Sequence, residues 1–453
     1  MKELSELKLE TTRLSRQIGI IKKWFAAGRI GLLLASTGFG KTTTGIITIR
    51  RLMKIDPFYK NTLVVVPTVY LKEQWEEKVK EHELINVRVI VINSLLIECE
   101  STKIDATLLI LDEIHKYVAD EFGKVYDCVN YNNVLGLTAT IDFADERFNI
   151  IKDKCPVFDE VTIEECLKNG WVNDFTIYTI PTTLTLKERL TYNNYNDKAM
   201  YYQSLFGYDY AMMMKCLNKD IATAYARSIN SEPDKIHLAA INGNKFVRLR
   251  KELLYNAENK YEIVKQINER FGNTKTLYFS QTSKSADRIT ELIPSCKSYH
   301  SNLNTIIIDK ENGEQVGQII TNKKSKTKLY YINGVPQSKL NSKIYKRVSK
   351  DKQLETIMKD YIDNKFTNLS TAIMLDVGAD IPDIETTVIH SATSKALQDI
   401  QRRGRGIRKF EDKIARNIQI YVEGTQDEKW LKSRLKLIPQ KYIVSVRSVL
   451  DIV

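Results

Sequence analysis

Short apolar runs recur through the first 152 residues, and polar stretches with helical periodicity separate them. A continuous apolar run of this length is typical of a strand buried on both faces of a sheet. Helical patterns between such strands, as in "YLKEQWEEKVKEH", indicate a parallel sheet that helices cover. Residues 1–152 therefore predict one α/β domain, with strands at "IGLLLAS", "TLVVVPT", "VRVIVIN", "ATLLILDE" and "NVLGLTAT".

A second series of apolar strands begins at "KTLYFSQ" and predicts another parallel-sheet domain over residues 274–440, followed by a C-terminal tail, 441–453. Its later strands are expected at "STAIMLDV", "ETTVIHSAT" and "NIQIYVEG". Residues 153–273 lie between the two domains and become mostly helical after "IEECLKNGWVNDFTIYTIP", which indicates a linker and an accessory region. Tyrosines gather there, and we expect them to pack helix faces, with base stacking as the alternative. They are Tyr192, Tyr195, Tyr201, Tyr202, Tyr208 and Tyr210.

Residues 304–350 interrupt the α/β alternation of the second domain. Their short strands and the turn pairs Asn312-Gly313 and Asn333-Gly334 predict a small antiparallel meander. Ten basic and three acidic residues between Ser301 and Lys350 give a local charge of +7, more than half of the net +12. This concentration indicates a polyanionic partner, whereas a basic insertion that merely decorates the surface is the alternative.

Length and composition limit the classes of protein to which the chain can belong. A chain of 453 residues is long enough for two or three domains, and no apolar run is long enough to cross a membrane. The charged N-terminus has no apolar segment typical of a secretory signal. The six cysteines form no CxxC pair, which argues against a zinc site or a disulfide framework and favours a reducing compartment, the cytoplasm. We expect all six to be buried as small apolar residues.

The stretch "LLLASTGFGKT" offers the first candidate chemistry. A strand, a glycine-bearing turn and a Lys-Thr pair at a helix start form the arrangement that binds phosphates. Gly38 and Gly40 let backbone N–H groups approach an anion, Lys41 is placed to reach the β- and γ-phosphates, and Thr42 is placed to ligate Mg²⁺. Thr37 belongs to the same loop. By itself, this stretch is also compatible with a chance glycine-rich turn.

An acidic pair, Asp112 and Glu113, ends the apolar strand "LLILDEIH". One carboxylate at such a place can hold Mg²⁺ through water, and the next can act as general base toward an attacking water. An acidic pair after a strand is also a common helix cap. Together with the glycine-rich loop, it predicts a site of nucleotide hydrolysis.

Four stretches, "ASTGFGKT", "DEIH", "LTAT" and "QRRGRGIR", resemble motifs I, II, III and VI of superfamily 2 helicases in their order along the chain. In that superfamily alanine is common at the position of Ala35. "VVVPTVYLKEQW" resembles motif Ia, and "LYFSQTSKSADRI", which contains Ser280 and Gln281, resembles motif IV. The resemblance implies two RecA-like domains with the helical region between them and the β-meander as an insertion in the second. It also implies ATP and Mg²⁺ as cofactors.

The resemblance implies roles for further residues of the first domain, each with a plainer alternative. Gln17 would read the adenine edge, or is a surface glutamine. His115 would couple the acidic pair to Thr138 and Thr140, which would link hydrolysis to strand movement. The plainer alternatives are an ordinary helix residue for His115 and an ordinary turn at a strand end for the two threonines. Pro67 and Thr68 would contact the nucleic-acid backbone, although Pro-Thr after a strand is also ordinary turn chemistry.

In the second domain, Arg405 and Arg408 resemble the arginine fingers that face the γ-phosphate. Gln401 resembles the residue that helps to hold the attacking water or the phosphate. A solvated basic run or a nucleic-acid patch is the alternative for this stretch. "TAIMLDVGADIPDIETTVIH" departs from the usual motif V because it is shorter. Asp380 would lie near the ribose and Thr371 near the DNA backbone.

The layout of the whole chain resembles small phage DNA-remodelling helicases of the UvsW type, such as the branch-migration helicases of T-five-like phages. This likeness implies a monomer in the host cytoplasm that unwinds forks and migrates junctions in DNA recombination, repair and replication. The basic insertion would split or grip the duplex, and its candidate nucleic-acid contacts are Lys323, Lys324, Lys326, Lys328 and Tyr330, with Tyr331 beside them. An RNA helicase and a non-catalytic nucleic-acid-binding module are the alternative functions.

Overall fold

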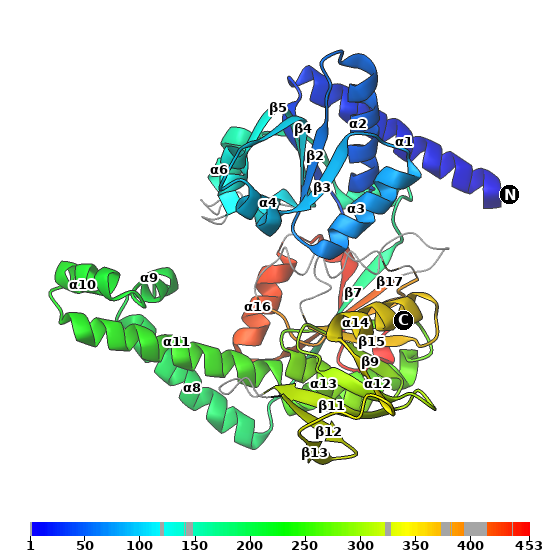
Figure 1. The fold of residues 1–453 in the computed structure, drawn as a ribbon. Helices are drawn as coiled ribbons and strands as arrows, with labels where there is room; N and C mark the ends of the chain where they lie inside the picture. Colours follow the sequence, from blue (N-terminus) through cyan, green and yellow to red (C-terminus); the bar gives the residue numbers. More distant parts are fainter. Residues whose placement is uncertain are drawn as a thin grey trace. The chain divides into compact units, whose positions relative to one another are not determined.

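The computed structural model describes residues 2–117, 122–139, 141, 148–321, 328–372, 381, 383–393, 415–436 and 438–453; for residues 2–11, 122, 321 and 328 it describes the backbone alone. The chain divides into two compact units (Figure 1), the first mainly Met1–Thr176 and the second mainly Ile177–Met374 and Asn417–Val453. No helix among the described residues is long and apolar enough to cross a membrane.

The first unit is built on a six-stranded sheet with the order β3-β2-β4-β5-β1-β6, and its neighbouring strands are parallel. The five strands expected from the apolar runs are all present, and β6 adds a sixth. The elements are α1 (Lys2–Ala26), β1 (Ile30–Ala35), α2 (Lys41–Ile55), β2 (Thr62–Val66), α3 (Val69–Glu81), β3 (Val87–Val91), α4 (Ile92–Glu98), β4 (Ile104–Asp112), η1 (Ile114–Lys116), η2 (Phe122–Lys124), α5 (Val125–Cys128), β5 (Val129–Thr138), α6 (Asn149–Lys154), β6 (Val157–Val161) and α7 (Ile163–Lys168).

Apolar side chains cover both faces of this sheet, as continuous apolar strands require. On one face the core joins the strands to α1, α2, α3 and α7, with Trp24 and Trp75 fully buried within it. On the other face the core joins them to α4, α5 and α6. Burial on both faces explains why the strands carry almost no alternation of polar and apolar residues.

The second unit holds a seven-stranded sheet with the order β18-β7-β17-β16-β8-β15-β9. Strand β15 is parallel to both β8 and β9, and α12 and α13 pack on one face through a shared apolar core. The elements around this sheet are β7 (Phe175–Thr182), α12 (Glu258–Phe271), β8 (Thr276–Ser280), α13 (Ser283–Leu292), β9 (Cys296–Tyr299), α14 (Lys350–Ile362), β15 (Asn368–Ala372), β16 (Thr386–Ile389), β17 (Ala415–Val422), α16 (Gln426–Leu435), η5 (Gln440–Tyr442), β18 (Ile443–Ser445) and η6 (Val449–Asp451).

A buried ion pair joins two helices of the second unit. The Lys260 Nζ atom in α12 lies 2.6 Å from the Asp427 Oδ2 atom in α16, and both side chains are excluded from water. Burial lowers the pKa of Lys260, and the neighbouring Asp427 carboxylate opposes that effect. Such a pair tolerates the loss of neither partner, because the other would remain as an uncompensated buried charge.

Residues 186–255 form a helical arm in which two long helices, α8 (Leu186–Ser204) and α11 (Pro233–Tyr255), pack along each other (Figure 1). The shorter α9 (Tyr210–Lys215) and α10 (Lys219–Ser228) share its core. The packing predicted for the tyrosines holds for Tyr192, which is buried, and for Tyr195 and Tyr202, whose rings contact Phe246. Tyr201 is 61% exposed, but its ring contacts the Tyr202 ring edge-on. The prediction is wrong for Tyr208, which is 61% exposed in the loop after α8.

The insertion is a separate antiparallel sheet with the order β13-β12-β11-β10-β14, which confirms the predicted meander. Asn333 and Gly334 have φ of 49° and 80°, as a tight hairpin turn requires. A small apolar core of Ile307, Ile319 and Ile332 holds the sheet together. Its strands are β10 (Thr305–Asp309), β11 (Gln315–Thr321), β12 (Lys328–Ile332), β13 (Val335–Gln337) and β14 (Tyr345–Val348).

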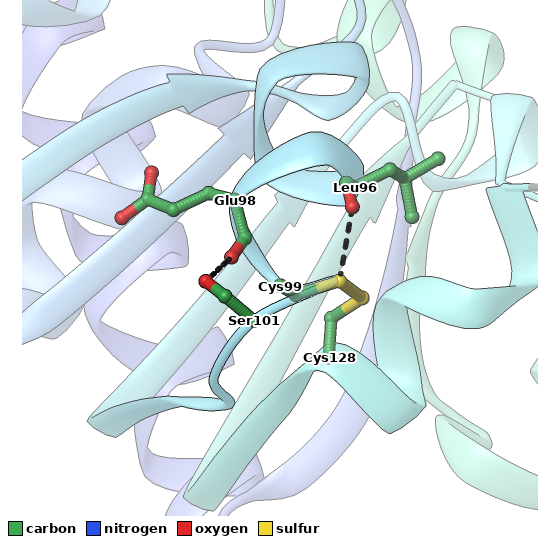
Figure 2. The surroundings of a disulfide bond; sticks show 5 residues. All are labelled: Leu96, Glu98, Cys99, Ser101 and Cys128. Carbon is green, nitrogen blue, oxygen red and sulfur yellow. Dashed lines mark hydrogen bonds between the residues drawn. A yellow bond between two sulfur atoms is a disulfide. The ribbon is translucent and has the colours of Figure 1, made fainter.

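The expectation of six unpaired cysteines is wrong for Cys99 and Cys128, which a disulfide joins (Figure 2). Cys99 follows α4 and Cys128 ends α5, so the packing of these two helices brings together residues 29 positions apart. No motif in the sequence signals this pairing. The other four cysteines are free and buried, as expected.

Candidate active site

The glycine-rich loop connects the buried end of β1 to the start of α2. Gly38 and Gly40 have φ of 88° and 98°, a left-handed conformation that side chains with a Cβ atom rarely adopt. Gly40 is the N-cap of α2 and has no side chain to cap it, so the N–H groups of the first turn need another acceptor. A phosphate would supply that acceptor, and the positive end of the helix dipole favours it.

Ala35 ends β1 and is fully buried in the core beneath the loop. The Lys41 Nζ atom lies 3.5 Å from the Ala35 carbonyl oxygen, so the ammonium group folds back toward the start of the loop. Thr37 lies in the turn and Thr42 is the second residue of α2, and both are half-buried. The loop therefore has the glycine-bearing turn that the sequence predicts, and Ala35 places a small side chain in the core beneath it.

Gln17 is buried in α1 and contacts the loop from behind. Its Nε2 atom donates hydrogen bonds to the carbonyl oxygens of Gly40, at 3.2 Å, and Phe39, at 3.4 Å. A Cβ atom on Gly40 would lie 2.9 Å from the same nitrogen. Gln17 is thus not a surface glutamine: it supports the loop backbone, and adenine recognition stays a prediction.

Asp112 lies at the end of β4, nearly fully buried, and its carboxylate accepts two hydrogen bonds. The Trp75 Nε1 atom donates to Oδ2 at 2.8 Å, and the Glu113 N–H donates to Oδ1 at 3.0 Å. Burial, together with the neighbouring Glu113, raises the pKa of Asp112 to about 6, while Trp75 and Lys41 act in the opposite direction. A bound cation would favour the ionised form further.

Glu113, His115 and Thr138 form a compact polar group beside Asp112. The His115 Nδ1 atom lies 2.8 Å from the Thr138 hydroxyl and 3.4 Å from the Glu113 Oε2 atom. The Thr138 hydroxyl donates to the same Glu113 oxygen at 3.5 Å. Burial lowers the pKa of His115 to about 4, so its ring is neutral at pH 7. The three residues that the motifs predicted to be coupled are therefore in direct contact.

Glu113 has a left-handed backbone, with φ of 51°, at the N-cap of η1. This conformation is uncommon for residues other than glycine and asparagine, and it concentrates at functional sites. The turn directs the chain from β4 into η1. Tyr117 comes directly after η1, and its hydroxyl donates a hydrogen bond to the Asp112 carbonyl oxygen at 2.8 Å. The backbone on both sides of the acidic pair is thus held in place.

Trp75 is a site residue that the sequence interpretation missed. Its ring is fully buried between α3 and α2, where a Cβ atom on Gly45 would come within 2.5 Å of it. The helix of the glycine-rich loop and the carboxylate of β4 therefore both contact this one side chain. Its signal in the sequence was the tryptophan that ends the stretch resembling motif Ia, on the apolar face of a helix, where an ordinary core residue would also lie.

The predicted nucleic-acid contacts occupy varied settings. The Thr68 hydroxyl caps α3 by accepting from the Leu71 N–H at 3.3 Å, directly after Pro67. Ser280 and Thr371 are buried at the ends of β8 and β15, and the Gln281 N–H donates to the Ser391 hydroxyl at 2.9 Å. Tyr330 packs against the core of the insertion.

Several predicted residues lie outside the described parts of the chain, and their roles stay predictions. They are Thr140, Lys323, Lys324, Lys326, Asp380, Gln401, Arg405 and Arg408, and of Lys328 only the backbone is described. Within the described residues no group of three or more His, Cys, Asp or Glu side chains could hold a metal ion. Mg²⁺ in nucleotide sites is bound by few protein ligands together with water and phosphate, which one carboxylate and Thr42 would match.

A phosphate-binding loop after β1 and an acidic pair after β4, both at the carboxyl edge of a parallel sheet, define the class of P-loop nucleotide hydrolases. Residues 11–93 match the family model of the type III restriction enzyme res subunit, and residues 298–409 match that of the helicase conserved C-terminal domain. These two matches, together with the relative described next, support an ATPase of the helicase type, as the motifs predicted.

One relative is the DNA 3'-5' translocase XPB2 of Sulfurisphaera tokodaii, which is 23% identical over 440 residues, or 92% of this chain and 83% of the relative. Among solved structures, S. cerevisiae Dbp5 bound to RNA and ADP BeF3 is 13% identical, covers 92% of this chain and 85% of its own, and has a TM-score of 0.53. The ATP-dependent type ISP restriction-modification enzyme LlaBIII bound to DNA is also 13% identical with a TM-score of 0.53, over 96% of this chain and 31% of its own. These structures confirm the predicted fold of two RecA-like parallel-sheet domains.

We predict that Trp75→Phe slows ATP hydrolysis about tenfold, because Asp112 loses a hydrogen-bond donor to its buried carboxylate. The matched control is Trp24→Phe, since the Trp24 indole is equally buried in this unit but donates to the Val134 carbonyl, at 3.0 Å. Both variants should lose about 1–3 kcal/mol of unfolding free energy in denaturant titrations. Equal losses of turnover in the two variants would show that Trp75 acts through stability alone.

Proposed function

We propose that this protein is an ATP-dependent DNA helicase or translocase that remodels branched DNA by unwinding forks and migrating junctions. The observation that carries the proposal is the part of the nucleotide site that the first unit holds, called the half-site below. There a left-handed glycine loop, Lys41 and the Asp112–Glu113 pair occupy one edge of the sheet. The relative named a DNA 3'-5' translocase supports DNA over RNA as the substrate. The fold alone does not distinguish DNA from RNA as the substrate, because the similar solved structures include one bound to RNA and one bound to DNA.

The residues of the first unit suit phosphoryl transfer to water. The N–H groups at the start of α2 and the Lys41 ammonium would hold the phosphates, while Thr42 and Asp112 would hold Mg²⁺. The metal, when bound, would neutralise charge that develops on the phosphate oxygens. Glu113 would accept the proton of the attacking water, and its contacts with Thr138 and the neutral His115 fix the orientation of that carboxylate.

In this proposal the predicted second domain, residues 274–440, supplies the remaining catalytic groups, as the likeness of "QRRGRGIR" to motif VI implies. Arg405 and Arg408 would stabilise charge on the γ-phosphate, Gln401 would help to hold the attacking water, and Asp380 would contact the ribose.

We predict that Lys41→Ala lowers the turnover of ATP by roughly 100-fold or more while DNA binding changes little, because the lysine contacts phosphate and not DNA. Lys54→Ala is the control, since Lys54 is exposed in the last turn of the same helix α2. Steady-state hydrolysis and fluorescence anisotropy with labelled DNA measure the two effects. Unchanged turnover in Lys41→Ala would overturn the assignment of the nucleotide site.

The choice of substrate is tested by a panel of nucleic acids. We expect forked and four-way DNA to stimulate ATP hydrolysis more than blunt duplex DNA, and structured RNA to stimulate it least. On a four-way junction with labelled arms, ATP should drive exchange of the arms into duplex products. Stimulation by RNA alone would replace the proposal by an RNA helicase, and equal stimulation by forked and blunt DNA would remove the preference for branches.

The basic insertion would act at the branch point as a wedge or a duplex grip. Strands β10 and β14 pair with each other, so residues 304–348 can be replaced by a Gly-Gly link that joins Leu303 to Ser349, the N-cap of α14. We predict that this deletion slows fork unwinding at least tenfold more than it slows DNA-stimulated ATP hydrolysis. Equal loss of both activities would contradict a role at the branch point and assign the insertion to folding.

A further inference from the structure

The register of the insertion sheet assigns its residues to two faces. Residues directly opposite each other in antiparallel strands point to the same face. Gly317 is opposite both Ile307 and Ile332, and Ile319 is opposite Tyr330, so these residues share one face. This face holds the apolar core, and Leu340 and Tyr345 pack against the core as well. It is the covered face of the sheet.

The opposite face is open. Tyr331 lies on it between Gln318 of β11 and Pro336 of β13, which are its direct neighbours across the sheet and are both exposed. Ile320 and Leu329 form the next pair on this face and are each 40% exposed. An open face that carries an aromatic ring, aliphatic side chains and an amide differs from the charged outer face of an ordinary sheet.

The two adjacent tyrosines of β12 therefore have different environments. Tyr330 packs on the core of the covered face, and the guanidinium of Arg347 lies 5.2 Å from the centre of its ring. Tyr330 is half-buried, and these two contacts engage its ring within the protein. Tyr331 is half-buried on the open face, where a flat ligand could reach its ring. The stacking role expected for Tyr330 passes to Tyr331.

Charge indicates the kind of partner that the open face fits. The three acidic residues of the insertion, Asp309, Glu311 and Glu314, gather at the turn between β10 and β11 together with Lys310, and the other nine basic residues lie elsewhere in the sequence. Lys346 is exposed on the open face itself, opposite Ile308. Apolar and aromatic groups on an insertion of net charge +7 suit a polyanion whose flat apolar surfaces are accessible. An unpaired nucleic-acid strand has both properties, whereas a duplex hides the faces of its bases.

We propose that the open face of the insertion sheet binds unpaired nucleotides, with Tyr331 stacking on a base and the exposed Lys346 contacting a phosphate. This inference rests on the proposed function and gives the insertion a more specific role than a steric wedge. By holding the separated strand, the face would prevent that strand from pairing again behind the branch point. The contact would be tolerant of sequence, because every base has a face on which a ring can stack.

The test compares Tyr331→Ala, Tyr331→Phe and the matched control Tyr330→Phe in the full-length protein. A 20-nucleotide single-stranded DNA and a blunt duplex serve as probes, and dissociation constants are measured at one fixed salt concentration without ATP. Tyr331→Ala should weaken binding of the single strand by about 5- to 100-fold and of the duplex by less than about twofold. Tyr331→Phe and Tyr330→Phe should bind as the unaltered protein does, because both keep their rings.

A second measurement guards against loss of folding. The three variants should retain the thermal unfolding midpoint and the ATP hydrolysis without DNA that the unaltered protein shows. Photo-crosslinking with an iodouridine-substituted strand should label Tyr331 and not Tyr330. Unchanged single-strand affinity in a folded Tyr331→Ala, or equal weakening for strand and duplex, would overturn the inference. Because binding is measured without ATP, this result is independent of the Lys41→Ala experiment, whose failure would instead overturn the proposed function.

Discussion

The active half-site depends on one geometric constraint: parallel strands end at the same edge of a sheet. Strands β4, β5 and β1 are consecutive in the sheet, with Asp112 beside Leu137 and Leu34 beside Thr138. The glycine loop, the acidic pair and the threonine therefore meet at one edge, although the chain separates them widely. Hydrogen bonding between neighbouring backbones sets this arrangement, so the site is as rigid as the sheet beneath it.

Burial then determines the chemistry of the groups at that edge. Asp112 and His115 are almost excluded from water, which raises the pKa of the carboxyl and lowers that of the imidazole. Burial of these two polar side chains is tolerated because each has a hydrogen-bond partner: Trp75 for Asp112 and Thr138 for His115. Polar groups held in this way need little reorganisation when charge develops on a substrate, which is the physical basis of electrostatic catalysis.

The second unit combines a rigid base with two additions. The ion pair of Lys260 with Asp427 joins α12 to α16. The Tyr192 hydroxyl accepts a hydrogen bond from the Gln426 N–H at 2.9 Å, which attaches the helical arm to the start of α16. The insertion has its own small core and its own sheet. An element with a separate core can change its surface without disturbing the motor fold, which suits a part that adapts one kind of motor to one kind of substrate.

The sequence by itself determined both α/β units, the strands that carry the motifs and the antiparallel insertion, because apolar runs, glycine pairs and an acidic pair after a strand follow local rules. It also brought Lys41, Asp112, Glu113, His115 and Thr138 into one site through their resemblance to known motifs. Only the tertiary structure decided which aromatic side chain supports Asp112, that Cys99 meets Cys128, and that Tyr331 instead of Tyr330 lies on the open face. These facts depend on packing between distant elements and on strand register, where a shift of one residue exchanges the two faces of a sheet.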